Sequence, residues 1–287
     1  MIGPLLAVFP HPDDETFTSA GVMAAAVARG VPVTVISATR GEAGESSLPG
    51  LDDPERLGVV RERELRDAMR QIGVTDVRML GYRDSGMEGS PQAEDAQAFI
   101  RVSVAVAAAK LVPHIRTIQP QVILTLGPEG MYGHPDHLHL HHVTLRAIAA
   151  AADPKHQVRA ASAPWQTPHC YFATVPREAM LELLNRPGSP LASISQTARD
   201  NLGTPQAGIT YAINVEPWAE VKRNAIAAHR TQTGEGGPLA QIPPEVRERQ
   251  LATEYFVRAR LPWSIADPAD DSAPDVIAML AAERPAG

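Results

Sequence analysis

Short apolar runs alternate with longer segments of helical spacing through the first half of the chain, and this alternation constrains the fold more than any other feature. Strands rich in apolar and β-branched side chains are expected at 5–9, 31–38, 77–80 and 122–126. Helices are expected at 16–29, 55–72, 92–118 and 134–152. Strands that alternate with helices of this length are joined by right-handed crossovers. The pattern predicts an α/β fold, with a Rossmann-like, doubly wound and mostly parallel sheet.

The alternation weakens after residue 152, where Pro and Gly become frequent. Further strands are expected at 171–175, 209–215 and 255–261, with a helix at 217–229. We interpret 153–265 as a cap or a C-terminal strand and helix extension of the sheet, and 266–287 as a tail with a helix at 274–283. A chain of 287 residues with 44 % hydrophobic residues can build one such α/β unit. We therefore expect a single domain over 1–287, of which 1–152 is the Rossmann-like half.

Two similar motifs follow two of the expected strands. The first reads HPDDE at 11–15, after the strand at 5–9, and the second reads HPDH at 134–137, after the strand at 122–126. Ligands of doubly wound sheets bind beyond the carboxyl ends of the strands. The architecture therefore predicts that the two motifs meet on one rim, although they are distant in sequence.

The residue types of these motifs suit a metal ion. In each motif the first residue and the residue three positions later can turn toward one point, with a Pro stiffening the turn. Three nitrogen and oxygen ligands with a position left for water describe a catalytic zinc site. A dication would also offset the repulsion among the crowded acids Asp13, Asp14 and Glu15. One such motif alone is more often accidental, but two at strand ends favour a site. His139, His141 and His142 follow HPDH on the expected helix and are weaker candidates for metal ligands. His141 lies one helical turn after His137, where it could hydrogen-bond to a residue that binds the metal.

The chain resembles the LmbE-like (PIG-L) family of zinc-dependent N-deacetylases. Its two signatures are the HPDDE at 11–15 and the HPDH at 134–137. The stretches TRGEAGE at 39–45, LGYRDSGM at 80–87, and Lys222 with HRTQ at 229–232 are also similar to the family, so the likeness spans about residues 5–235. Arg83 stands where the family usually has Pro, in a loop and away from the expected metal.

The resemblance implies a role for each residue of the two motifs. His11, Asp14 and His137 would bind one zinc ion per chain, with Fe²⁺ or another divalent metal as a substitute. Asp13 would be the general base that takes a proton from the metal-activated water. His134 would support the oxyanion or protonate the leaving amine. By the same resemblance, Tyr132 would stabilise the oxyanion and Asp136 would orient one of the histidines. Amide hydrolysis needs an activated water, a stabilised oxyanion and a proton for the amine. Glu15 is expected to favour the helix dipole.

The resemblance also implies the substrate class. Members act mostly on N-acetylglucosamine derivatives, among them inositol-linked and malate-linked precursors of low-molecular-weight thiols, glycolipids and chitin fragments. The expected partner is therefore a small amino-sugar conjugate, from which an N-acetyl group is removed. Candidates for hydrogen bonds to sugar hydroxyls are Arg40, Glu42, Arg61 and Asp84. Arg61 is equally interpretable as an exposed charge on a helix.

Two other functions fit parts of the pattern. His11-x-Asp13 with a distant His also describes the 2-His-1-carboxylate triad of non-haem iron oxygenases, although such triads usually occupy β-barrels. A non-catalytic sugar- or metal-binding protein would lack the base, whereas Asp13 is present. No Gly-rich phosphate loop follows the first strand, which argues against a nucleotide-binding Rossmann enzyme.

Composition excludes several partners. The net charge is −7 without a basic run, so nucleic acid and anionic membranes are poor partners. The Ala/Val-rich stretch at 102–112 contains Lys110 and is too short to span a bilayer. One cysteine, Cys170, excludes an intrachain disulfide, and the first nine residues lack the pattern of a signal peptide. We expect a cytoplasmic protein, and the family likeness adds the possibility of a homo-oligomer.

Overall fold

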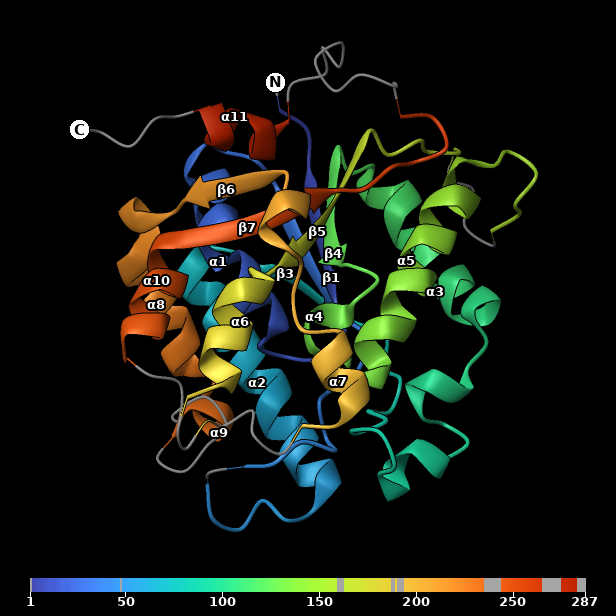
Figure 1. Ribbon diagram of the computed structural model, residues 1–287. Helices are drawn as coiled ribbons and strands as arrows, with labels where there is room; N and C mark the ends of the chain where they lie inside the picture. Colours follow the sequence, from blue (N-terminus) through green and yellow to red (C-terminus); the bar gives the residue numbers. More distant parts are fainter. Residues whose placement is uncertain are drawn as a thin grey trace.

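A seven-stranded sheet organises the computed structural model, in the order β3-β2-β1-β4-β5-β7-β6 (Figure 1). The structure describes residues 2–46, 48–158, 163–186, 189, 194–234, 244–264 and 275–282. The strands are β1 Leu5–Phe9, β2 Val33–Ser37, β3 Asp76–Met79, β4 Val122–Leu126, β5 His169–Thr174, β6 Tyr211–Asn214 and β7 Thr253–Arg258. Strands β1 to β5 are parallel, whereas β7 is antiparallel to both β5 and β6. The mostly parallel, doubly wound α/β sheet predicted from the sequence is confirmed.

Helices cover both faces of this sheet. The helices are α1 Asp14–Ala28, α2 Pro54–Ile72, α3 Val104–Ile118, α4 Gly130–Gly133, α5 Pro135–Ala152, α6 Arg177–Leu184, α7 Gln196–Asp200, α8 Ala219–Ala228, α9 Arg230–Thr233, α10 Pro244–Ala252 and α11 Val276–Ala282. Helices α3 and α5 pack together on one face, and α1, α2 and α8 pack on the other (Figure 1). Every helix in the described part of the chain is too short or too polar to span a lipid bilayer.

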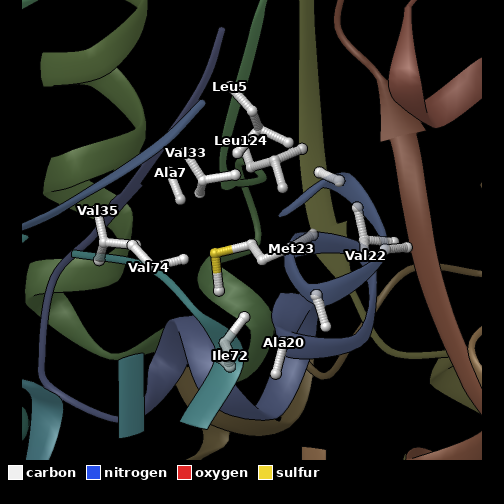
Figure 2. Close-up of a cluster of buried hydrophobic side chains, with 14 of the residues drawn as sticks. Leu5, Ala7, Ala20, Val22, Met23, Val33, Val35, Ile72, Val74 and Leu124 are labelled. Atoms are coloured by element: carbon white, nitrogen blue, oxygen red, sulfur yellow. The ribbon is translucent and has the colours of Figure 1, made fainter. Parts of the chain in front are cut away.

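The two faces of β1 divide the core. Leu5, Ala7 and Phe9 belong to one cluster of fully buried side chains, and Leu6 and Val8 belong to the other. Figure 2 shows part of the first cluster, with Met23 of α1 among side chains of the neighbouring strands. Because both faces are covered, β1 is a continuous apolar run, as central parallel strands usually are. The strand is thereby fixed from both sides, and so is the loop that leaves its carboxyl end.

One expected helix is wrong in its extent. A continuous helix was expected over 92–118, but the segment forms two 3₁₀ turns, Pro91–Glu94 and Phe99–Arg101, before α3 begins at Val104. Ser103 caps α3 by accepting a hydrogen bond from the backbone N–H of Val106. Such a cap contributes about 1 kcal/mol, which favours a start at this residue. Phe99 is completely buried and anchors the preceding turn to the core.

The extension joins the sheet. β5, β7 and β6 continue it beyond β4. Lys222 of α8 is buried and pairs with Glu254 of β7 at 2.7 Å. Both carboxylate oxygens of Glu254 also accept backbone N–H groups of α1, from Gly21 and Val22 at 2.8 Å each. A buried charge is tolerated when it is paired and its hydrogen bonds are filled. This pair therefore fastens α8 and β7 to α1, the helix that begins in the HPDDE motif.

Candidate active site

The two histidine motifs meet at the carboxyl ends of β1 and β4. These strands are neighbours, and the chain order reverses between them, since β2 lies on the other side of β1. Ligands of doubly wound sheets bind at such a switch point. The loop after β1 carries His11, Asp13 and Asp14, and the loop after β4 leads through α4 to the start of α5 at Pro135. The sheet therefore brings the motifs together, as the sequence predicted.

Three donor atoms from these loops form a nearly equilateral triangle. Nδ1 of His11 lies 3.2 Å from Nε2 of His137 and 3.2 Å from Oδ2 of Asp14. Oδ2 of Asp14 lies 3.3 Å from Nε2 of His137. Ligand atoms about 2.0–2.1 Å from a tetrahedral metal are separated by roughly 3.3 Å. The spacing of these three atoms is thus that of ligands around one ion.

The outer nitrogen of each imidazole is already engaged. Nε2 of His11 lies 3.2 Å from Oδ2 of Asp136, and Nδ1 of His137 lies 3.1 Å from the carbonyl oxygen of Gly130. When these outer nitrogens carry the ring protons, both inner nitrogens direct lone pairs toward the Asp14 carboxylate. Three lone-pair donors at this distance repel unless a cation lies among them. The buried His and Asp cluster can therefore hold a metal ion, with the ring of His134 also within reach.

The pKa values of His11 and Asp14 are also shifted in the directions that favour positive charge in the cluster. Burial alone would lower the pKa of His11, but the carboxylates of Asp84, Asp136 and Asp14 raise it well above its usual value. Burial would raise the pKa of Asp14, yet His137 and His11 hold it well below its usual range. The carboxylates of the site therefore favour a positive charge among them, which either a proton on His11 or a metal ion would supply.

Asp13 and Asp14 are adjacent but face different partners. Asp14 faces the two histidines and also accepts the backbone N–H of His11 at 3.1 Å. Asp13 has φ 120° and ψ −33°, an uncommon conformation for any residue other than glycine. Such a conformation costs roughly 1–3 kcal/mol and persists where surrounding contacts enforce it. The two carboxylates, which have different partners, thus leave the chain at an uncommon backbone turn.

The carboxylate of Asp13 contacts Arg61 of α2. Nη2 of Arg61 donates to Oδ2 of Asp13 at 3.2 Å and to the carbonyl oxygen of Pro12 at 2.7 Å, while Nη1 donates to the carbonyl oxygen of Gly41 at 2.7 Å. Burial raises the pKa of Asp13 to about 6, and the Arg61 guanidinium opposes that rise. Arg61 is only 4 % exposed, so the exposed-charge interpretation is wrong. Its expected contact with a sugar stays a prediction, because its guanidinium is engaged with the Asp13 loop.

His134 and Tyr132 flank the triangle. His134 caps α5, where its Nδ1 accepts the backbone N–H of Asp136 at 3.1 Å, so its ring proton resides on Nε2. Burial and the neighbouring His11 and His137 lower the pKa of His134 well below its usual value. The ring of Tyr132 packs edge-on against that of His137, with centroids 4.8 Å apart, and burial raises the pKa of its hydroxyl. The site thus contains a neutral imidazole and a protonated phenol as hydrogen-bond donors.

The loop that carries Tyr132 is held by the extension. Met131, just before it, has φ 62° and ψ −50°, a second uncommon conformation for a residue with a side chain. Its carbonyl oxygen accepts the backbone N–H of Gly203 at 2.7 Å, and Oε1 of Glu129 accepts the Thr204 hydroxyl at 2.5 Å. Residues 203 and 204 therefore fix the backbone at Tyr132 from outside the Rossmann-like half.

The remaining sugar-binding candidates lie around the triangle with partners of their own. Oδ1 of Asp84 lies 3.4 Å from Nε2 of His11 and accepts the N–H of Gly86, while Oδ2 accepts the N–H of Ala43. Glu42 is buried, which raises its pKa, and it accepts the N–H of Arg40 at 3.2 Å. The guanidinium of Arg40 pairs with Glu55 of α2 at 2.7 Å.

The other histidines of α5 have contacts outside the triangle. Nδ1 of His141 lies 3.1 Å from the carbonyl oxygen of Leu126, and the ring of His139 packs against Phe99. His142 stacks edge-on against His141.

Sequence reasoning missed two polar contacts of the site. Ser85 donates its N–H and its hydroxyl to the two oxygens of Asp136, which fixes the carboxylate behind His11. Glu15 is completely buried and accepts the N–H of Asp13 at 3.2 Å, so it has a specific partner besides the helix dipole. The position of Ser85 directly after Asp84, in the loop that follows β3, was a usable signal. No feature of the sequence indicated that the Glu15 side chain turns back toward the backbone N–H of Asp13.

Comparison with known proteins identifies the family of the chain. Residues 6–148, which include both motifs, match the model of the PIG-L family, described as GlcNAc-PI de-N-acetylase. A 1D-myo-inositol 2-acetamido-2-deoxy-alpha-D-glucopyranoside deacetylase from Geodermatophilus obscurus is 37 % identical over 281 residues, covering 93 % of this chain and 95 % of that protein.

Two solved structures share the fold at low identity. The N,N'-diacetylchitobiose deacetylase of Pyrococcus horikoshii has a TM-score of 0.62 at 18 % identity, covering 91 % of this chain and 87 % of that one. The hydratase GalB of Pseudomonas putida has a TM-score of 0.59 at 16 % identity, covering 93 % of this chain and all of that one (100 %). A fold that is shared by a deacetylase and a hydratase does not select the reaction. The sequence match and its two motifs do carry the assignment, and the chain belongs to the PIG-L (LmbE-like) family.

Proposed function

We propose that this protein is a metal-dependent deacetylase that hydrolyses the N-acetyl group of an N-acetylglucosamine conjugate. The observation that carries the proposal is the triangle of His11, Asp14 and His137 donor atoms, with sides of 3.2, 3.2 and 3.3 Å, beside the separately directed carboxylate of Asp13. We assign these three residues as the metal ligands. When bound there, a divalent ion such as zinc polarises the acyl carbonyl and lowers the pKa of water.

Asp13 is the proposed general base. It accepts a proton from the attacking water, which requires that its carboxylate be ionised. Arg61 favours the ionised form, against the burial that raises the Asp13 pKa to about 6. Once protonated, Asp13 can return the proton to the departing amine, which an amide needs in order to leave.

His134 and Tyr132 are the proposed donors to the oxyanion. The lowered pKa of His134 keeps its ring neutral, with the proton on Nε2 because Nδ1 accepts the N–H of Asp136. A neutral ring is a hydrogen-bond donor and a poor general acid. Of the two roles that the resemblance implied for His134, these observations favour support of the oxyanion.

An inositol-linked N-acetylglucosamine is the substrate that we propose, because two sequence relatives at 37 % and 38 % identity carry the name of such a deacetylase. A pocket of about 380 Å³ lies next to the site residue Glu42, and Glu45, Ser46, Asp52 and Gln92 also line it. Carboxylates accept hydrogen bonds from hydroxyls, so this lining suits an uncharged polyol better than an anion. Arg40, Glu42, Arg61 and Asp84 remain the candidates for sugar contacts.

The oxygenase alternative is not favoured. The HxD triad would require Asp13 to share a metal with His11, whereas Asp13 contacts Arg61 and Asp14 faces the histidines.

The test is the release of primary amine from a panel of N-acetylglucosaminyl conjugates, with inositol, malate and chitobiose as aglycones, before and after chelation and zinc repletion. We expect metal-dependent release, greatest for the inositol conjugate. Equal turnover after exhaustive chelation, or cleavage of acetylated peptides but of no glucosaminide, would refute the proposal.

A further inference from the structure

The HRTQ segment, residues 229–232, has no part in the chemistry described so far, yet His229, Thr231 and Gln232 are buried. It follows α8, which the buried pair of Lys222 and Glu254 fastens to α1. Each of its buried side chains contacts a different element of the rim. A segment that is fixed in this way can hold the side chains that it contacts in one position.

His229 contacts the start of α1. Its Nε2 lies 3.0 Å from the Thr16 hydroxyl and 3.6 Å from Oε1 of Glu15, and the Thr16 hydroxyl donates to the same Glu15 oxygen at 2.5 Å. Nδ1 of His229 is buried and has no hydrogen-bond partner among the described residues. The imidazole therefore makes its polar contacts at Nε2 alone, where it holds Thr16 and Glu15.

Glu15 connects Thr16 and His229 to the backbone of Asp13. While Oε1 faces Thr16 and His229, Oε2 accepts the backbone N–H of Asp13 at 3.2 Å. That N–H belongs to the residue whose φ is 120°. Side chains with short, fixed partners can hold a backbone in a conformation that it would otherwise leave. Glu15, Thr16 and His229 form one such support on one side of Asp13.

Thr231 and Gln232 contact the elements that hold Arg61. Glu64 accepts both the N–H and the hydroxyl of Thr231, at 2.9 and 2.6 Å, and Glu64 lies one helical turn beyond Arg61 in α2. Nε2 of Gln232 donates to the carbonyl oxygen of Glu45 at 2.9 Å, in the loop whose Gly41 carbonyl binds Arg61. The segment thus secures the helix and the loop that hold the Arg61 guanidinium against Asp13.

We propose that the HRTQ segment is a positioning element for Asp13, which fixes both its backbone, through Thr16 and Glu15, and its carboxylate, through Glu64 and Arg61. The inference rests on the proposed role of Asp13 as general base. Displacing a base by a fraction of an ångström lowers the rate of proton transfer without removing substrate contacts. The segment should therefore act on kcat and leave KM and metal affinity unchanged.

The test uses pairs of variants that differ in one hydroxyl. Thr16→Val and Thr231→Val delete the hydroxyls at nearly constant volume, whereas Thr16→Ser and Thr231→Ser retain them. We expect each Val variant to lower kcat about tenfold or more, with KM and metal content as in the wild type, and each Ser variant to restore most of the rate. Thr144→Val is the matched control, because Thr144 is also buried with a hydroxyl contact, to Thr125 of β4.

The Asp13→Asn background separates positioning from general destabilisation. If the segment acts through Asp13, adding Thr16→Val or Thr231→Val to Asp13→Asn should leave the residual rate, measured over long incubations, unchanged. An equal further fall in both backgrounds, a loss of metal, or no effect of either Val variant would refute the inference alone. A wild-type kcat in Asp13→Asn would instead refute the base assignment, and this inference with it.

Discussion

The carboxylate of Asp13 accepts a hydrogen bond from the Arg61 guanidinium at 3.2 Å, while its neighbour Asp14 faces His11 and His137 at 3.2 and 3.3 Å. Two consecutive acids therefore have separate partners, one a fixed cation of the protein and the other a pair of imidazoles.

The first prediction concerns metal retention. His137→Ala and Asp14→Asn each remove one corner of the donor triangle, and a neutral amide is a poorer ligand than a carboxylate. We expect both purified variants to contain much less than one divalent ion per chain, measured by elemental analysis after dialysis. Full occupancy in His137→Ala would remove this residue from the ligand set. His141→Ala is the control, since its ring is bonded to the Leu126 carbonyl, and it should retain the metal.

The second prediction separates the base from the ligands. Asp13→Asn keeps the size of the side chain but removes the basic oxygen. We expect metal content near that of the wild type and a kcat lower by roughly 10²–10⁴, the usual contribution of general base catalysis. The reverse pattern, with metal lost in Asp13→Asn and kept in Asp14→Asn, would exchange the two roles and favour the HxD triad.

The third prediction concerns the acid limb of the pH profile. Burial raises the pKa of Asp13 to about 6, and Arg61 lowers it from the value that burial alone would give. A base is active when deprotonated, so kcat/KM should fall as pH falls through the Asp13 pKa. A bound dication lowers this pKa further and places the limb below 6 in the metal-loaded enzyme.

Removing the positive charge of Arg61 raises the Asp13 pKa, so Arg61→Met should move the acid limb to higher pH. Arg61→Lys keeps the charge and should move the limb less. A limb at the same pH in the wild type and in Arg61→Met would contradict the electrostatic role of Arg61.

The fourth prediction concerns the loop of Tyr132. Gly203 has φ 53°, and a Cβ added to it would lie 2.4 Å from the carbonyl oxygen of Val175. We expect Gly203→Ala to lower the free energy of unfolding by more than about 1 kcal/mol, measured by urea denaturation. It should also lower kcat, because the Gly203 N–H that holds the Met131 carbonyl would move. Gly30→Ala is the control, since its φ is also positive but its Cβ would meet nothing within 4 Å, and it should leave kcat unchanged.

The sequence predicted the sheet and the meeting of the two motifs because these depend on patterns that recur along the chain. The apolar runs, the helical spacing and the position of each motif after a strand are all local features. The parallel topology then places the carboxyl ends of these strands, and with them both motifs, at one edge of the sheet. The partners of Arg61 and Glu15 could not be predicted in this way. They depend on the backbone turns at Asp13 and Gly41, which present the carbonyl groups of Pro12 and Gly41 to Arg61 and the N–H of Asp13 to Glu15. Neither an acid at a helix start nor an arginine on a helix indicates such a partner by itself.

The place of β7 in the sheet has a consequence for biosynthesis. Among the described strands β7 is synthesised last, yet it lies inside the sheet, between β5 and β6. β6 pairs with β7. During synthesis β6 therefore lacks this partner until residues 253–258 have emerged from the ribosome. The HRTQ segment belongs to the stretch between these two strands, and Glu254 of β7 supplies the carboxylate that binds Lys222. The nascent chain can therefore complete the support of Asp13 only when β7 joins the sheet, and activity should not appear before residues 253–258 have been synthesised.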